Sequence, residues 1–198
     1  METAVWIAVL FASVITHEVA HGWVAERFGD PTARLMGRIT LNPLVHIDPI
    51  GTVLLPAALL LLGAPFLFGY AKPVPVDFAR LSPMRLGTAL VAAAGPLVNL
   101  VWALAGAWPV AHGHMLWGEP MLTLNALLFV FNMLPIPPLD GSKLVAAMLP
   151  ERWMWRWWAW ERYGLVVVFA LLLLGGFAWV MRALVRPLAE ALLALAGG

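Results

Sequence analysis

The chain has 198 residues, of which 62% are hydrophobic and 12% charged, and its formal net charge is +1 at pH 7. This charged share is about half that of soluble proteins, and with a mean hydropathy of +0.86 it predicts an integral membrane protein. The small net charge offers no electrostatic support for a nucleic-acid partner, and the lack of cysteine excludes disulfides, thiolate zinc ligands and a cysteine nucleophile.

The first apolar segment, residues 3–25, is long enough to cross a membrane as a helix. It contains an H-E-x-x-H motif made of His17, Glu18 and His21. On a helix the two histidines lie one turn apart on one face, as two ligands of one zinc require, and Glu18 lies on an adjacent face where it can act on a zinc-bound water. In a soluble helix such a motif is usually a solvated face, but ionisable groups in an apolar span are costly and indicate function.

Further apolar segments predict spans at residues 86–110, 120–134 and 164–185. Residues 50–70 form a fifth apolar stretch, which is interrupted by prolines and a glycine. This stretch either crosses the membrane as a fifth span, since Pro and Gly are tolerated in membrane helices, or dips in and returns.

Loop charge favours the second alternative for residues 50–70. Basic residues occur in the regions 26–49, 71–85 and 141–163, whereas 111–119 has none. A re-entrant segment puts all three basic regions on the cytoplasmic side, as the distribution of charge in membrane proteins requires. The sequence therefore predicts an all-α polytopic membrane protein with about four to five transmembrane helices and a re-entrant or β-hairpin segment around residues 37–76.

Asp140 is the candidate for the third zinc ligand, because catalytic zinc sites usually have three protein ligands and a water. It follows the proline-rich run 135–138, and irregular backbone at membrane depth is tolerated where it lines an enclosed cavity. Gly141 allows a tight turn there. The alternative is that Asp140 only caps a helix beginning near Ser142.

The motif His17-Glu18-x-x-His21 is followed far downstream by Asn132-x-x-Pro135-x-Pro137-x-Leu139-Asp140-Gly141. This pair of motifs resembles the site-2 protease family of intramembrane zinc metalloproteases, peptidase family M50. Residues 95–99 also resemble the family, and residues 37–43, 46–49 and 71–75 are similar to its compact bacterial and archaeal branch, which lacks PDZ and CBS domains. The resemblance implies one Zn²⁺ per chain held by His17, His21 and Asp140, with Glu18 as the catalytic base.

The resemblance also implies a function and a location. The chain is expected to hydrolyse peptide bonds in transmembrane segments of membrane protein substrates, in regulated intramembrane proteolysis. It would be a multi-pass protein of a prokaryotic cell membrane, surrounded by the lipid bilayer. Loop charge, and not the resemblance, puts the expected active site toward the cytoplasm. The substrate, the oligomeric state and the triggering signal stay open.

Four further residues are candidates of lower rank. Asn132, Asn99 and Lys72 are candidate substrate-binding residues. The resemblance implies this role for Asn132, which could instead bond a neighbouring helix. His46 could orient a zinc ligand from the second layer around the metal, or it could pair locally with Asp48. An extended edge at 37–42 or 71–76 could hold an unwound substrate by strand addition.

We expect one integral membrane protease domain over residues 1–198. Its catalytic core would cover about 3–145, followed by an interfacial tryptophan-rich segment at 150–163 and a C-terminal span at 164–185. Two other functions compete. A membrane metal transporter would favour several sites and repeats, and an inactive relative that only binds membrane helices would have no use for an intact set of His17, Glu18, His21 and Asp140.

Overall fold

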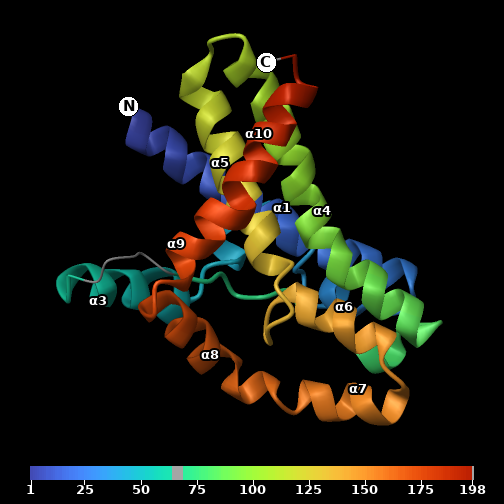
Figure 1. Cartoon of the computed structure of the whole chain (residues 1–198). Coiled ribbons are helices and arrows are strands. Elements are labelled where there is room, and N and C mark those ends of the chain that lie inside the picture. The colour runs from blue at the N-terminus through green and yellow to red at the C-terminus, as the bar shows by residue number, and fades with distance from the viewer. Residues whose placement is uncertain (64–68, 198) are drawn as a thin grey trace.

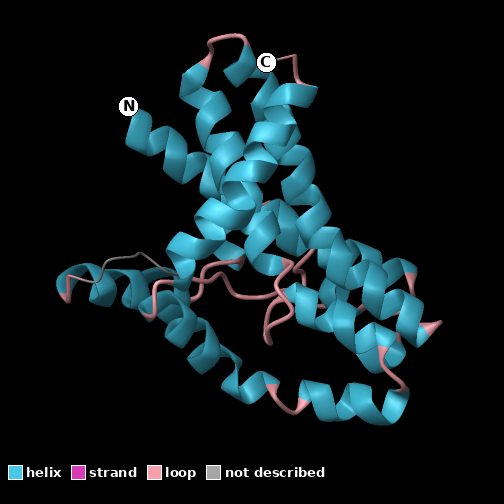
Figure 2. Ribbon diagram, in the orientation of Figure 1, coloured by secondary structure: helices cyan, strands magenta, loops and turns pink. Residues whose placement is uncertain are grey.

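The computed structural model describes residues 1–63 and 69–197 of the chain. Every regular element formed by these residues is helical, and they form no strand (Figure 2). The longer helices are α1 (Glu2–Arg27), α4 (Met84–Ala111), α5 (Met115–Asn132), α6 (Asp140–Met148), α7 (Glu151–Trp158), α8 (Glu161–Leu173) and α10 (Arg186–Leu195). The shorter ones are α2 (Thr32–Leu35), η1 (Pro43–Val45), η2 (Pro49–Leu54), α3 (Leu55–Leu61), η3 (Phe78–Arg80), α9 (Gly176–Val180) and η4 (Met181–Val185).

The helical, membrane-type fold predicted from the sequence is confirmed, but with fewer candidate spans. Within the described residues, α1 and α4 are long and apolar enough to cross a membrane, and α8 forms a third span if it is joined with Gly176–Leu195. These two pieces are bent by 78° at Gly175, whose φ of +82° is a backbone conformation that glycine adopts at little cost. The span predicted at 164–185 is therefore broken in its middle.

The region around residues 37–76 contains no β-hairpin in its described part. It consists of η1, η2 and α3, which lies away from the other helices in Figure 1, and then an extended segment that reaches residue 77. Prolines at 49, 56, 73 and 75 remove backbone donors that a strand ladder would need. Residues 64–68 of the predicted re-entrant stretch lie outside the described residues.

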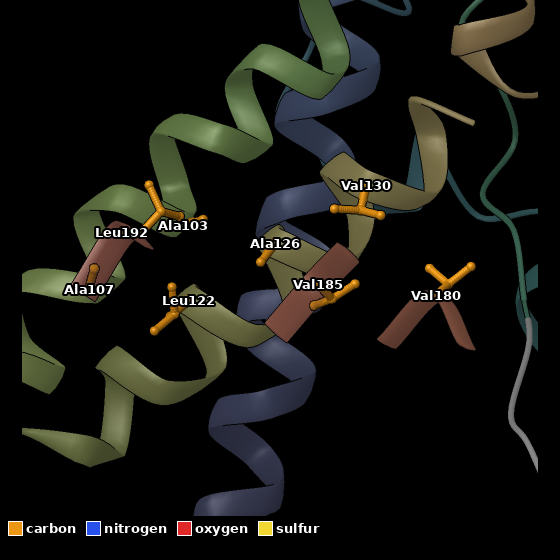
Figure 3. Close-up of a cluster of buried hydrophobic side chains, with 8 residues drawn as sticks. All are labelled: Ala103, Ala107, Leu122, Ala126, Val130, Val180, Val185 and Leu192. Atoms are coloured by element: carbon orange, nitrogen blue, oxygen red, sulfur yellow. The ribbon is translucent and has the colours of Figure 1, made fainter. Parts of the chain in front are cut away.

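Helix α4 is the centre of the fold and packs against α1, α5, α6 and α10. One buried cluster joins α4 and α5 to the C-terminal elements, and Figure 3 shows its members: Ala103, Ala107, Leu122, Ala126, Val130, Val180, Val185 and Leu192. Small residues let α4 and α5 approach closely, since a Cβ on Gly106 would lie 2.6 Å from the Cβ of Met121. This close packing brings polar side chains of α4 and α5 within hydrogen-bonding distance.

The tryptophan-rich segment forms α7 and the turn into α8, and both helices run along one end of the molecule (Figure 1). The side chains of Trp153, Trp155 and Trp160 are exposed, and the guanidinium of Arg156 lies 5.1 Å from the centre of the Trp153 ring. Exposed indoles beside arginines are typical of membrane–water interfaces. The interfacial role of residues 150–163 stays a prediction.

Candidate metal centre

Three donor atoms from two distant parts of the chain form a small triangle. The Nε2 atoms of His17 and His21, on α1, lie 3.0 Å apart, and each lies 3.2 Å from Oδ2 of Asp140 at the start of α6. All three residues are buried. The structure thus brings together the three residues that the sequence predicts as metal ligands, which form the one group of three or more potential ligands within the described chain.

Both histidines turn their other ring nitrogen toward an oxygen of α4. His17 Nδ1 lies 2.6 Å from Oδ1 of Asn99, and His21 Nδ1 lies 2.6 Å from the carbonyl oxygen of Val91. Carbonyl oxygens only accept hydrogen bonds. Each Nδ1 therefore carries the proton, and each Nε2 presents a lone pair toward the triangle, as metal-binding histidines do.

A chain of buried amides fixes the orientation of Asn99. Asn125 Nδ2 donates to the Met121 carbonyl at 2.9 Å, and Asn99 Nδ2 donates to Oδ1 of Asn125 at 2.9 Å. Because the Met121 carbonyl can only accept, it sets the direction of both amides, and the Asn99 oxygen is left facing His17. Asn99 and Asn125 are each 0% exposed, so water does not compete for these bonds.

The triangle fits a zinc ion. Tetrahedral ligands bound at about 2.0–2.2 Å from zinc lie about 3.3–3.6 Å from one another, close to the observed spacing. Two imidazole lone pairs and a carboxylate oxygen repel at 3.0–3.2 Å unless a cation lies between them. The two histidines and one carboxylate are also a donor set that zinc accepts, with a fourth position left for water.

The sequence of α4 explains why the histidines can lie against it. Gly95 faces the site, and a Cβ there would collide with His21 Nε2 and lie 2.6 Å from His17 Nε2. Pro96 follows it inside the helix. A proline in a helix donates no hydrogen bond and crowds the carbonyl four residues before it, here that of Ala92. The neighbouring carbonyl, that of Val91, is the one that bonds His21.

Asp140 is the first residue of α6, and the residue at its N-cap is Leu139. The capping alternative is thus not observed. Gly141 lies so close to the Met133 and Leu134 carbonyls that a Cβ there would collide with both, so the turn after α5 closes tightly enough to carry Asp140 back to α1. The second carboxylate oxygen, Oδ1, faces Lys143 Nζ at 3.4 Å, while Oδ2 faces the histidines.

Asp140 belongs to α6, which is not among the candidate spans. The ammonium of Lys143, 3.4 Å from Oδ1, favours the charged form of this buried carboxyl group. The carboxylate is therefore ionised and able to bind a cation.

Glu18 lies beside the triangle but is not part of it. Its Oε2 accepts a hydrogen bond from the backbone N–H of Val74 at 2.7 Å. Gly22, one turn further along α1, makes room for this contact, because a Cβ there would lie 2.8 Å from Val74 Cγ1. Glu18 thus faces the extended segment before η3 while His17 and His21 face α4.

The lower-ranked candidates lie in three different environments. Asn132 donates to the Leu128 carbonyl within α5, and Lys72 is exposed with its backbone N–H bonded to the His46 carbonyl. The His46 ring is buried with Nε2 2.9 Å from the Thr40 carbonyl. Asp48 instead caps η2 by accepting from Ile50 and Gly51. The roles predicted for these residues stay predictions.

Several residues around the site were missed by sequence reasoning. Lys143 follows Asp140 by three residues on one helix, a spacing that signals an ion pair. Asn125 is a polar residue within an apolar helix, which is a signal for an interhelical bond. Val91 and Val74 gave no signal, because both act through their backbone.

The fold and the donor set define a class: a membrane protein with a buried His-His-Asp metal centre. The family described as Peptidase family M50 matches residues 5–116, more than half of the chain. The chain therefore belongs to peptidase family M50, the site-2 protease family, and it is a zinc metalloprotease of that family.

Named relatives agree with this membership. A Bacillus subtilis protein named "Putative zinc metalloprotease YwhC" is 37% identical over 180 residues, which cover 83% of this chain and 78% of the relative. Proteins named "Putative zinc metalloprotease Rip2" from Mycolicibacterium smegmatis and Mycobacterium tuberculosis are each 34% identical, over 68% and 73% of this chain. The matched part spans 53% and 58% of those two relatives. No solved structure matches the chain.

Proposed function

We propose that this chain is an intramembrane zinc metalloendopeptidase that hydrolyses peptide bonds in transmembrane segments of membrane proteins. The observation that carries the proposal is the triangle of His17, His21 and Asp140 with Glu18 beside it. His21 and His17 lie about 9 and 15 Å along α1 from its Arg27 end, at the helical rise of about 1.5 Å per residue. Peptide bonds cut at this depth belong to segments that are embedded in the membrane.

The residues of the chain divide the chemistry between them. His17, His21 and Asp140 would hold one zinc ion, which lowers the pKa of a bound water and polarises the scissile carbonyl. Glu18 would take the proton of the attacking water and later deliver it to the leaving amine. Asn99 and the Val91 carbonyl keep both histidines in the tautomer that leaves Nε2 free.

A substrate helix must unwind before its backbone is accessible, and the segment 71–76 offers an extended edge for it. In this segment Lys72 bonds inward through both its N–H and its carbonyl, to the His46 carbonyl and to Arg38 Nη2. Pro73 lies on the opposite edge and has no N–H, so that edge offers acceptors. We assign the opposite edge to the substrate backbone, with Lys72 and Asn132 as further contacts.

We place the active site toward the cytoplasmic side of a prokaryotic cell membrane. The basic regions 26–49, 71–85 and 141–163 support this orientation. Most loop segments lie together at one end of the helix group, between it and α7 (Figure 2). A metal transporter is less well supported, because transport favours several sites along a path, and the described residues hold one cluster.

The test is cleavage by purified protein in liposomes that contain a labelled transmembrane substrate. We expect cleavage that a zinc chelator abolishes, and that Glu18→Gln abolishes while zinc stays bound. Glu26→Gln is the matched control, because Glu26 lies on the same helix and pairs with Arg34 at the surface. Activity in Glu18→Gln would refute the assignment of the base, and zinc flux without cleavage would favour transport.

A further inference from the structure

An extended segment, residues 70–77, crosses the molecule next to Glu18, and we call it the strap. Backbone N–H groups of alternate strap residues bond to the protein: Tyr70 to the Gly51 carbonyl at 3.1 Å, Lys72 to the His46 carbonyl at 2.9 Å and Val74 to Glu18 Oε2 at 2.7 Å. Alternation is what an extended chain requires, because successive backbone groups point to opposite sides. Glu18 thus occupies the third position of a regular ladder.

The strap is held on both sides of Val74. On one side the Lys72 carbonyl accepts from Arg38 Nη2 at 2.7 Å, and Arg38 is buried. On the other side the Asp77 N–H donates to Asp30 Oδ2 at 2.7 Å, and Asp30 is 0% exposed. The Val74 N–H is therefore fixed in place by anchors that do not include Glu18.

The local sequence makes this position rigid. Val74 stands between Pro73 and Pro75. A residue before proline is restricted to extended conformations, and proline fixes its own φ. The flanking prolines also carry no N–H, so between Lys72 and Val76 the strap has one donor, and that donor faces Glu18.

We propose that the backbone N–H of Val74 positions the catalytic base: the strap holds Oε2 of Glu18 and leaves Oε1 to take the proton. This inference rests on the proposed function, in which Glu18 is the base. A carboxylate on α1 has rotamer freedom of its own, and a fixed donor removes it. Displacement of a reacting group by about 1 Å costs up to about 100-fold in rate.

A kinetic test deletes this one donor. Val74→Pro turns residues 73–75 into three prolines, which favour the extended conformation and lack the N–H. Val74→Ala keeps the N–H and shortens the same side chain, so it measures the loss of packing alone. We expect kcat of Val74→Pro to be about 10- to 100-fold below that of Val74→Ala, with similar KM and similar zinc content in both.

Three results would overturn the inference. Equal kcat values of the two variants would mean that the N–H does not act on Glu18. A higher kcat in Val74→Pro than in the wild type would mean that the strap blocks the site. A loss of zinc or of thermal stability in Val74→Pro alone would mean that the contact is structural.

Hydrogen exchange tests the contact without relying on activity. Between residues 71 and 76 the exchangeable amides are those of Ala71, Lys72, Val74 and Val76, because the two prolines have none. We expect Glu18→Ala to speed exchange at Val74 by about tenfold, and Glu26→Ala, on the same helix, to leave the strap unchanged. Unchanged protection in Glu18→Ala would refute the contact, whereas an inactive wild type would refute only the proposed function.

Discussion

The Nε2 atoms of His17 and His21 lie 3.0 Å apart, although neither carries a proton to share. Both protons are on Nδ1, where α4 provides the acceptors. A divalent cation between these atoms would relieve their repulsion, so we expect zinc to stabilise the folded state. The carboxylate of Asp140 at 3.2 Å from each nitrogen completes the set.

Asp140→Ala should abolish stoichiometric zinc binding. It removes one of three donors, and loss of an outer hydrogen-bond partner alone already costs about 10- to 100-fold in metal affinity. Zinc content after gel filtration measures the effect. Asp48→Ala removes a carboxylate that only caps η2 and should keep one zinc per chain. One zinc per chain in Asp140→Ala would show that Asp140 is not a zinc ligand.

Asn99→Leu should weaken zinc binding by about 10- to 100-fold, because His17 loses the acceptor that fixes its tautomer. Asn125→Leu should also weaken zinc binding, but by less. It removes the acceptor of the Asn99 Nδ2 hydrogen bond, and with it the link to the Met121 carbonyl that fixes the orientation of the Asn99 amide. Competition with a chromophoric chelator gives both affinities. If Asn125→Leu weakens zinc binding more than Asn99→Leu does, Asn125 does not act through Asn99.

Gly95→Ala should be far more harmful than its single methyl group suggests. The added Cβ would occupy the space of the histidine Nε2 atoms, so zinc is lost and α1 is pushed away from α4. Overpacking of this kind costs about 1–3 kcal/mol in the free energy of unfolding. Leu97→Ala, at an exposed position on the same helix, is the control, and thermal unfolding with zinc analysis distinguishes the two. Normal zinc content in Gly95→Ala would contradict the geometry.

Gly164→Ala tests a contact between the C-terminal part and the site. Gly164 of α8 lies directly on the turn before Asp140, and a Cβ there would collide with the Pro137 carbonyl and lie 2.6 Å from Pro138 Cδ. We expect Asp140 to be displaced and kcat to fall about tenfold or more. Val166→Ala is the control: Val166 is exposed and lies two residues after Gly164, so this variant should retain wild-type kcat. Equal rates in the two variants would show that α8 does not support the turn.

The cluster of His17, His21 and Asp140 was predictable from sequence because it rests on side-chain chemistry at fixed spacing. Two histidines four residues apart on an apolar helix must share a face, and Asp140 is a rare carboxylate in a proline-punctuated turn. The hydrogen-bond partners of these residues were harder to predict from the sequence. Sequence reasoning names Asn99 as a candidate for substrate binding and gives no sign of the contact seen in the structure, where its buried side-chain oxygen faces His17. Val74 acts through a backbone N–H, which every residue except proline has, so its residue type did not indicate this role.

The fold was predictable in class but not in its breaks. Apolar composition alone indicates helices in a membrane, and the described residues are all-helical. Apolar runs do not reveal where a helix bends, since Leu174 and Gly175 continue the hydrophobic stretch that the positive φ of Gly175 interrupts. The ladder of the strap depends on partners in η2 and α1 that are distant in sequence.

The separation of the donors along the chain has a consequence for biosynthesis. His17, Glu18 and His21 leave the ribosome early, whereas Asp140 is made about 120 residues later, which takes about 6–24 s at about 5–20 residues per second. A nascent chain that stops anywhere before residue 140 holds the base and two imidazoles without the third donor. If these four residues form the active centre, proteolytic capacity arises only after α4 and α5 have been made, and a chain that stops before residue 140 cannot cut its neighbours in the membrane.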